Sequence, residues 1–459
     1  MFTFDKEKRY FLKDGKPHFF KLDTAWMALT NLTVQEFREY ATFRKNQGYN
    51  GLLMQNTPAF QDMPKHVKYF PFVIREDGSY DLSKRNDAYF AQAKEKMKIL
   101  RELDMTAFLV PMWVSFVPHS QMEKVFDCRG KQFESFEDYK NVVDFSIDLY
   151  KEFHPVWLIG GDAELTEENK TNWQYYSYMA EQIRRKCPDD LMSGHVAGGH
   201  YLGESYLKNG YIDFYTYQSG HMLSTLSQFY SPGRMAEKSW ATEPKLPVMN
   251  LEPMYEAHGY GNRFGRFGAA DVRRAFWFSV LHGAKAGFAY GAHGIWMFYD
   301  GSGFNNENWS KIPLNWRSAL TLQGSYDMVA SADLFERYDM FDLVPQRELC
   351  LTPYEEVAVA ATLDLSKIVA YTTATTHLDF ALDLTGYDCT WHLLDDKQML
   401  DVPKVACKPG AEWIREYEAL SEGQLQKLEF SEAYKAAPAI SRVAMYQYNT
   451  DAVLVCVKK

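Results

Sequence analysis

The sequence predicts an α/β protein, a (β/α)8 TIM barrel followed by a C-terminal antiparallel β-sandwich. From Tyr10 to about Asp300, short apolar runs alternate with segments of helical periodicity, and eight such runs can be assigned as strands. The runs are continuously apolar, as expected of parallel strands that are buried on both faces. From Leu349 onward the pattern changes to short β-like runs, which predicts a separate second domain.

The predicted barrel contains eight strands and five long helices. The expected strands are residues 18–26, 51–57, 105–113, 156–161, 191–196, 212–218, 247–251 and 287–296. The expected helices are residues 33–47, 86–103, 134–152, 173–186 and 270–284. The first helix has the clearest ends, because Thr33 and Glu36 suit a capping box and Gly48 is a C-cap signal. No GxGxxG motif follows the first strand, which argues against a dinucleotide-binding fold.

The predicted domain division is a catalytic barrel at residues 1–340 and a β-sandwich at residues 345–459. Short β runs lie at residues 357–362, 367–373, 378–384 and 389–394, and two further runs flank Asn449–Asp451 as a hairpin would. The stretch 408–436 fits neither a helix nor a strand clearly.

Composition excludes several classes of protein. The chain has 459 residues, of which 46% are apolar and 24% charged, and these are ordinary globular values. A net charge of −10 without a Lys/Arg cluster argues against a nucleic-acid partner. No stretch of 18 apolar residues predicts a membrane span, and the N-terminus lacks the apolar core of a signal peptide. Six cysteines without a CxxC pair are expected to be free thiols, and we expect a cytoplasmic protein. The sequence does not set the oligomeric state.

Two carboxylates stand where a barrel places its reacting groups, just past the carboxyl ends of its strands. Asp162 follows the fourth strand and a Gly-Gly pair, and Glu252 ends the seventh strand. Strands four and seven lie across the barrel mouth from each other, and two facing carboxyls are what glycoside hydrolysis requires. Each also has a structural alternative. Asp162 could cap a helix, Glu252 could pair with Arg273 or Arg274, and Glu256 is a rival for the second role.

Other polar and aromatic side chains at the same strand ends are candidates for substrate binding. They are Asp23, Trp26, Gln55, Asn56, Trp113, His195, Tyr217, Tyr255, Glu256, His293 and Trp296. Asp23 could equally bond to backbone amides, and each aromatic could equally belong to the core. His195, His221 and His293 could ligate a metal, but their spacing matches no zinc pattern, so no metal and no cofactor are expected.

Five stretches of the chain resemble the DUF4038 family of glycoside hydrolases, which is related to the apiosidase-type enzymes of glycoside hydrolase family 140. They are DTAW (23–26), RKNQGYNGLLMQN (44–56), VWLIGGD (156–162), PVMNLEPMYE (247–256) and DVRRAFWFSVLHGAKAGFAYGAHGIW (271–296). The resemblance covers about residues 8–335, and more faintly the small β-domain that often follows.

The resemblance implies a retaining glycosidase with its acid/base on strand four and its nucleophile on strand seven. Asp162 matches the Gly-Gly-Asp of the family and would be the acid/base, and Glu252 matches the first Glu of Glu-Pro-x-Tyr-Glu and would be the nucleophile. Leu22, Ala163 and Leu251 depart from the family pattern. Family members often carry Arg where this chain has Ala163, so that departure bears on which sugar is bound.

We therefore expect an O-glycosyl hydrolase, exo-acting and retaining, whose substrate is a pectic or other plant-type oligosaccharide or a furanoside. Two alternatives remain open at this stage. One is a carbohydrate-binding protein without catalysis on a barrel scaffold, and the other is a metal-dependent barrel hydrolase or isomerase.

Overall fold

The computed structural model describes most of the chain. The described residues are 2–58, 68–124, 127–166, 170–223, 229–261, 265–301, 310–352, 355–374, 376–402, 404–420, 430–444 and 450–459. The chain divides into two compact units, one of Met1–Ser279 with Ala284–Arg337 and the other of Val280–Gly283 with Tyr338–Lys459.

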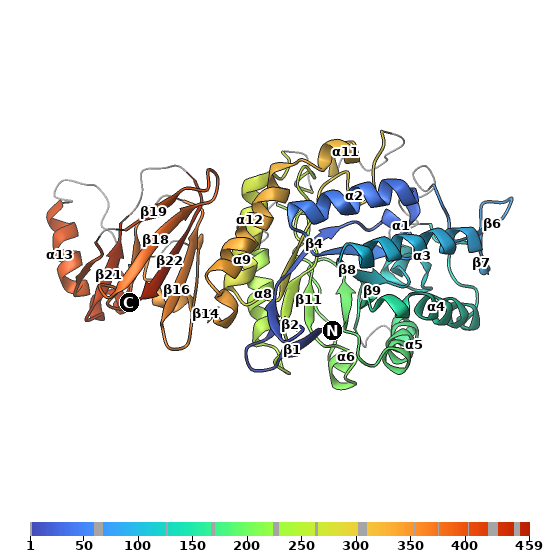
Figure 1. The fold of residues 1–459 in the computed structure, drawn as a ribbon. Coiled ribbons are helices and arrows are strands. Elements are labelled where there is room, and N and C mark those ends of the chain that lie inside the picture. The colour runs from blue at the N-terminus through green and yellow to red at the C-terminus, as the bar shows by residue number, and fades with distance from the viewer. Residues whose placement is uncertain are drawn as a thin grey trace. The chain divides into compact units, whose positions relative to one another are not determined.

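The first unit is a (β/α)8 barrel, which confirms the predicted fold class (Figure 1). Its strands, all parallel, are β4 (Phe20–Thr24), β5 (Gly51–Gln55), β8 (Thr106–Val110), β9 (Val156–Ala163), β10 (Met192–Val196), β11 (Tyr215–Tyr217), β12 (Val248–Asn250) and β13 (Gly287–Tyr290). Strands β10 and β11 are the two ends of the hydrogen-bonded order. They are joined by a backbone bond from Asp213 to Met192 of 2.8 Å and by the Ser193 hydroxyl, which donates to the Phe214 carbonyl.

Helices lie around the outside of these strands (Figure 1). They include α2 (Val34–Gln47), α3 (Asp87–Glu102), α4 (Phe136–Tyr150), α5 (Lys170–Lys186), α6 (Glu204–Lys208), α8 (Ser231–Ala241), α9 (Ala269–Leu281) and α12 (Gln323–Arg337). The predicted start and end of the first long helix are confirmed. Thr33 and Glu36 form the reciprocal capping box, and Gly48 takes the left-handed conformation at φ 108°.

A small antiparallel sheet precedes the barrel and was not predicted. It consists of β1 (Phe2–Asp5), β2 (Tyr10–Lys13) and β3 (Lys16–His18). Phe11 of this sheet packs edge-on against Phe20 and Phe214, with ring centroids 5.2 Å away in both cases. Since Phe20 begins a barrel strand and Phe214 immediately precedes another, the sheet covers the amino-terminal end of the barrel with aromatic surface.

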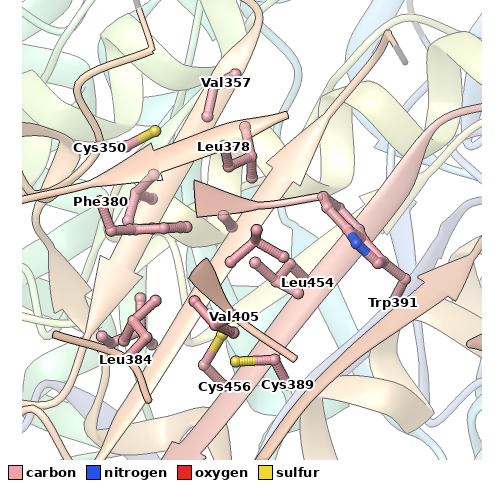
Figure 2. Packing of buried hydrophobic residues seen from close by; sticks show 14 of the residues in the cluster. Cys350, Val357, Leu378, Phe380, Leu384, Cys389, Trp391, Val405, Leu454 and Cys456 are labelled. Atoms are coloured by element: carbon pink, nitrogen blue, oxygen red, sulfur yellow. The ribbon is translucent and has the colours of Figure 1, made fainter. Parts of the chain in front are cut away.

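The second unit contains two antiparallel sheets. One has the order β14-β15-β16-β22-β18-β19 and the other β17-β21-β20. The strands are β14 (Val344–Pro345), β15 (Val357–Ala361), β16 (Lys367–Thr372), β17 (Leu378–Phe380), β18 (Tyr387–Leu393), β19 (Met399–Asp401), β20 (Ala406–Lys408), β21 (Ile440–Val443) and β22 (Ala452–Lys458). Alternate residues of neighbouring strands form its core, among them Cys389, Trp391, Leu454 and Cys456 (Figure 2).

Two details of this unit bear on the sequence predictions. The ambiguous stretch 408–436 contains two helices, α13 (Gly410–Leu420) and α14 (Glu432–Ala436). The first run of the expected hairpin falls largely on residues 445–449, which lie outside the described residues.

All six cysteines are free thiols, as predicted. Among the described helices, none combines the length and the apolar character that a bilayer-crossing segment needs.

Candidate active site

Asp162 is displayed by an irregularity in strand β9. His195 pairs with Gly160 and the next residue of β10 pairs with Ala163, so two residues of β9 bulge out of the ladder. Gly160, Gly161 and Asp162 all have positive φ, at 88°, 126° and 53°. Glycine tolerates such angles and Asp does so better than most residues, whereas a β-branched side chain would be strained. The bulge re-aims the Asp162 side chain at the carboxyl end of the strand.

Glu252 lies two residues beyond β12 and is 5% exposed. Its Oε1 accepts a hydrogen bond from the Tyr255 hydroxyl at 2.6 Å and another from His221 Nε2 at 3.0 Å. The Tyr255 oxygen in turn accepts a hydrogen bond from Trp26 Nε1 at 2.7 Å. Two side-chain donors therefore fix one carboxylate oxygen of Glu252.

The backbone sets the tautomers of the two histidines beside Glu252. The Asp162 N–H donates to His195 Nδ1 at 3.0 Å, and the Tyr255 N–H donates to His221 Nδ1 at 3.3 Å. A ring nitrogen that accepts carries no proton, so in each neutral ring the proton sits on Nε2. Both Nε2 atoms face Glu252, since His195 Nε2 lies 3.1 Å from Oε2. Glu252 is thus surrounded by donors, which is the environment of an ionised carboxylate.

The two oxygens of Glu252 differ in their hydrogen bonding. Although His195 Nε2 is close to Oε2, neither atom has a well-aligned hydrogen-bond partner among the described residues. Oε2 therefore keeps a lone pair for another atom. Asp162 Oδ1 is likewise buried without a hydrogen-bond partner.

Burial and charge separate the pKa values of the two carboxyls. Burial, and then the charge of Glu252, raise the pKa of Asp162 from 3.8 to about 6. Burial alone would raise the pKa of Glu252 too, but the neighbouring imidazoles of His195 and His221 outweigh it and hold that pKa below its ordinary value. Asp162 therefore keeps its proton up to about pH 6, where Glu252 is already ionised, and this is the division that general acid catalysis beside a carboxylate needs.

Three potential metal ligands lie close together in this site, namely Asp162, His195 and Glu252. One oxygen or nitrogen from each residue lies within 4.8 Å of the others. The fit to a cation is poor, because His195 Nδ1 already accepts the Asp162 N–H and Nε2 holds the ring proton. A ligating histidine must present a free lone pair. The three side chains therefore suit a pair of carboxyls with an imidazole between them better than a cation site.

Aromatic rings enclose the carboxyl pair. Trp26 lies 4.7 Å from the His195 ring and 5.4 Å from Trp113, between ring centroids. Trp113 approaches the bulge so closely that a Cβ on Gly161 would be 2.5 Å from its ring. Its Nε1 has no hydrogen-bond partner among the described residues. The two indole rings thus give the site apolar walls, and Trp113 Nε1 gives it one hydrogen-bond donor without a partner among the described residues.

A row of imidazoles extends from Glu252. His221 lies 4.8 Å from His258, which lies 4.7 Å from His293. Burial lowers the pKa of His258 to about 2 and that of His293 to about 4, so both are neutral at pH 7. His293 Nε2 donates to the Lys311 carbonyl and Nδ1 accepts from Trp296. His293 and Trp296 therefore bond to each other and to the backbone.

Several predicted substrate-binding residues are held by other parts of the protein. Asp23 Oδ2 accepts hydrogen bonds of 2.5 Å from both Tyr40 and Arg44 in the buried core. Glu256 accepts from the Tyr290 hydroxyl at 2.7 Å and from the Gly324 N–H at 3.0 Å. These carboxylates brace the barrel wall, since their oxygens are directed at partners from other helices and strands.

Amide and phenol side chains at two further strand ends behave similarly. Asn56 accepts from Tyr150 at 2.7 Å, and its amide donates to the Ser146 hydroxyl at 3.1 Å. The Tyr217 hydroxyl donates to the Pro232 carbonyl at 2.9 Å. Gln55 differs, because its buried Oε1 has no hydrogen-bond partner among the described residues.

The structure thus brings together six residues that the sequence predicted for the site. They are Asp162, Glu252, His195, Tyr255, Trp26 and Trp113. The structural alternative for Glu252 is wrong, because Arg273 pairs with Asp327 and Arg274 with Asp271.

Two residues of the site were missing from the predicted set. The sequence predicts His221 only as a possible metal ligand and Gln218 only as the last residue of the expected strand 212–218. The Gln218 side chain lies beside the Asp162 carboxyl and lowers its pKa as a hydrogen-bond donor would. Its position immediately after β11 was the available signal.

The sequence model of the apiosidase-like catalytic domain matches residues 5–342. No curated protein sequence matches the chain.

Two solved structures illustrate how far the fold is shared. One, described as a glycoside hydrolase, is 18% identical, with a TM-score of 0.75, and the match covers 100% of this chain and 97% of that one. A glycoside hydrolase family 5 structure from Bacteroides vulgatus ATCC 8482 is 20% identical, with a TM-score of 0.75, and the match covers 100% and 93% of the two chains. At these identities the likeness shows that the fold is shared.

Proposed function

The chain belongs to the apiosidase-like family and is an O-glycosyl hydrolase, and from this premise we propose that it is a retaining, exo-acting glycosidase. Glu252 is the nucleophile and Asp162 the general acid/base. The substrate class is a pectic or other plant-type oligosaccharide or a furanoside, consistent with the apiosidases for which the family is named.

One observation carries the mechanism, namely the closeness of two carboxyls with opposite protonation. An oxygen of Asp162 and an oxygen of Glu252 lie within 4.8 Å of each other. Retaining enzymes hold their carboxyls about 5–5.5 Å apart, whereas inverting enzymes leave about 6.5–9.5 Å for a water molecule. The close approach of the two oxygens is compatible with the spacing of a retaining pair and so with direct attack by Glu252.

The free atoms of the pair suggest how each step proceeds. Glu252 Oε2 attacks the anomeric carbon while Oε1 stays bonded to Tyr255 and His221. Asp162 gives its proton to the departing glycosidic oxygen, and a glycosyl ester on Glu252 results. Asp162, now ionised, takes a proton from water, whose oxygen attacks the anomeric carbon and frees Glu252.

The test is product release from pectic oligosaccharides and from aryl pyranosides and furanosides. Wild type should cleave at least one of them, and Glu252→Gln should reduce kcat by a factor of about 10⁴ or more while remaining folded. Glu256→Gln is the matched control, because Glu256 is another buried carboxylate of the same loop whose oxygens are bonded to Tyr290 and Gly324. If Glu252→Gln kept most of the activity, the assignment would be wrong.

Two further measurements separate the finer parts of the proposal. With an activated aryl leaving group, Asp162→Ala should still form the ester, and azide should restore turnover by giving a glycosyl azide of unchanged anomeric configuration. Proton NMR of the first product should show retention, and the opposite anomer would overturn it. A loss of activity in chelator that a divalent ion restores would instead favour a metal-dependent hydrolase.

A further inference from the structure

Gln218 combines two features that the proposed mechanism leaves unexplained. Only 6% of the residue is exposed, and its side chain lies beside the Asp162 carboxyl, whose pKa it lowers as a donor would. Its Oε1 is buried and has no hydrogen-bond partner among the described residues. An unsatisfied buried acceptor destabilises the folded protein, so an amide oxygen held in this state calls for a hydrogen-bond donor from a ligand.

A position beside this oxygen carries no side chain. Residue 198 is glycine, and a Cβ there would lie 3.2 Å from Gln218 Oε1, closer than is comfortable. The Gly199 N–H donates to the Gln218 carbonyl at 3.1 Å, which fixes the backbone of the residue. Asp162 Oδ1 and Trp113 Nε1 are also buried without partners. Unpaired acceptors and an unpaired donor around one carboxyl match the hydroxyls of a sugar, which both donate and accept.

The order of the strands indicates which hydroxyl is meant. Gln218 follows β11, which lies between the strand of His195 and the strand that leads to Glu252. Asp162 and Glu252 both act at the anomeric centre, so a side chain that contacts Asp162 from between them faces the substituents next to that carbon. An amide oxygen accepts from a hydroxyl but gains nothing from the ring oxygen, which is itself an acceptor. This leaves the hydroxyl on the neighbouring carbon.

We infer that Gln218 is a specificity-determining residue whose Oε1 accepts a hydrogen bond from the 2-hydroxyl of the sugar held between Asp162 and Glu252. The inference rests on the proposed function and assigns a role to a residue of the same site. A hydrogen bond to this hydroxyl strengthens as positive charge develops at the anomeric carbon, so its contribution is larger in the transition state than in the bound substrate.

A double-mutant-type cycle tests the assignment, in which the amide of Gln218 and the 2-hydroxyl of the substrate are removed singly and together. The probes are the 4-nitrophenyl glycoside that wild type cleaves best and its 2-deoxy analogue. Gln218→Met keeps the length of the side chain and removes both polar atoms. It should reduce kcat/KM for the parent glycoside by about 10- to 100-fold, with most of the loss in kcat, because the bond strengthens in the transition state.

The coupling between the two changes shows whether the Gln218 amide and the 2-hydroxyl interact. Because the 2-deoxy glycoside cannot make the bond, Gln218→Met should reduce its kcat/KM by less than about threefold. If Gln218→Met reduced both substrates by the same factor, the 2-hydroxyl would not be the partner of Gln218. Gly198→Ala crowds Oε1 without removing it. This variant should likewise reduce kcat/KM more for the parent glycoside than for the 2-deoxy glycoside. If Gln218→Met showed this selective loss and Gly198→Ala did not, the amide nitrogen of Gln218 would be the interacting atom instead of Oε1.

An activity-independent readout separates this inference from the proposed function. Calorimetry with the folded Glu252→Gln variant compares the released monosaccharide with its 2-deoxy form, with and without Gln218→Met. Gln218→Met should weaken binding of the monosaccharide alone. Equal weakening of both forms would overturn the inference even if Glu252 is the nucleophile. Turnover by wild type that Glu252→Gln abolishes supports the proposed function whatever Gln218 does.

Discussion

Replacing Asp162 by Asn should stabilise the protein, and increasingly so as the pH rises. Asn has the same shape as protonated Asp and tolerates the left-handed backbone at φ 53° equally well. Ionised Asp162 is costly because burial and the neighbouring Glu252 charge raise its pKa from 3.8 to about 6. The substitution removes that cost and, with it, the proton donor of the proposed mechanism.

The magnitude and its sign follow from linkage. The folded state holds the Asp162 proton more tightly than the unfolded state, so the penalty is absent below about pH 4. It grows as the pH rises to about 6 and is constant above that. About two pKa units correspond to ~3 kcal/mol, and the partial exposure of the side chain reduces this to ~1–3 kcal/mol. For a barrel unit of about 330 residues, this raises Tm by roughly 1–4 °C.

Thermal unfolding from pH 4 to pH 8 measures the effect as the Tm of Asp162→Asn minus that of wild type. The difference should be near zero at pH 4 and reach its maximum by about pH 7. Asp77→Asn serves as a control of opposite sign, because bonds from the Ser79 hydroxyl and N–H lower the pKa of this exposed carboxylate. A difference for Asp162→Asn that is negative or independent of pH would refute the reasoning.

Three further predictions concern the rest of the site. Arg44→Met, which leaves Asp23 buried and uncompensated, should destabilise by about 3–5 kcal/mol and lower Tm by roughly 4–7 °C in calorimetry; an unchanged Tm would contradict the bracing role. The pH profile of kcat/KM should fall tenfold per unit above about pH 6 as Asp162 loses its proton, and a plateau extending to pH 8 would exclude Asp162 as the acid. Gly161→Ala forces a Cβ to within 2.5 Å of Trp113 at φ 126°, so kcat should drop by at least about tenfold, and full activity would show that the bulge is not required.

Local sequence pattern determined the architecture of this protein. Parallel strands buried on both faces must be continuously apolar, and helices must show a 3.6-residue period, so both could be identified without knowing their partners. The capping box at Thr33 and Glu36 was equally local, since its hydrogen bonds span three residues. In a barrel, the residues at the carboxyl ends of the strands lie on one face. This rule predicts that Asp162 and Glu252 belong to the same site.

The short N-terminal sheet escaped prediction for a related reason. Its strands, such as Phe2–Asp5, have three or four residues, which is too short for a period to register. Phe11 is buried only because Phe20 and Phe214 come from other elements. Its stability is therefore a matter of tertiary packing.

Tertiary structure alone decided which strand-end residues are free to act. Asp23 and Glu252 are both buried carboxylates after apolar strands, and the sequence gives no means of separating them. Asp23 is bonded to Arg44 and Tyr40, whereas Glu252 keeps an unbonded oxygen beside Asp162. The protonation states depend on the same kind of contact. The tautomer of His195 is set by a backbone N–H 33 residues away, because charge and hydrogen bonding act through space.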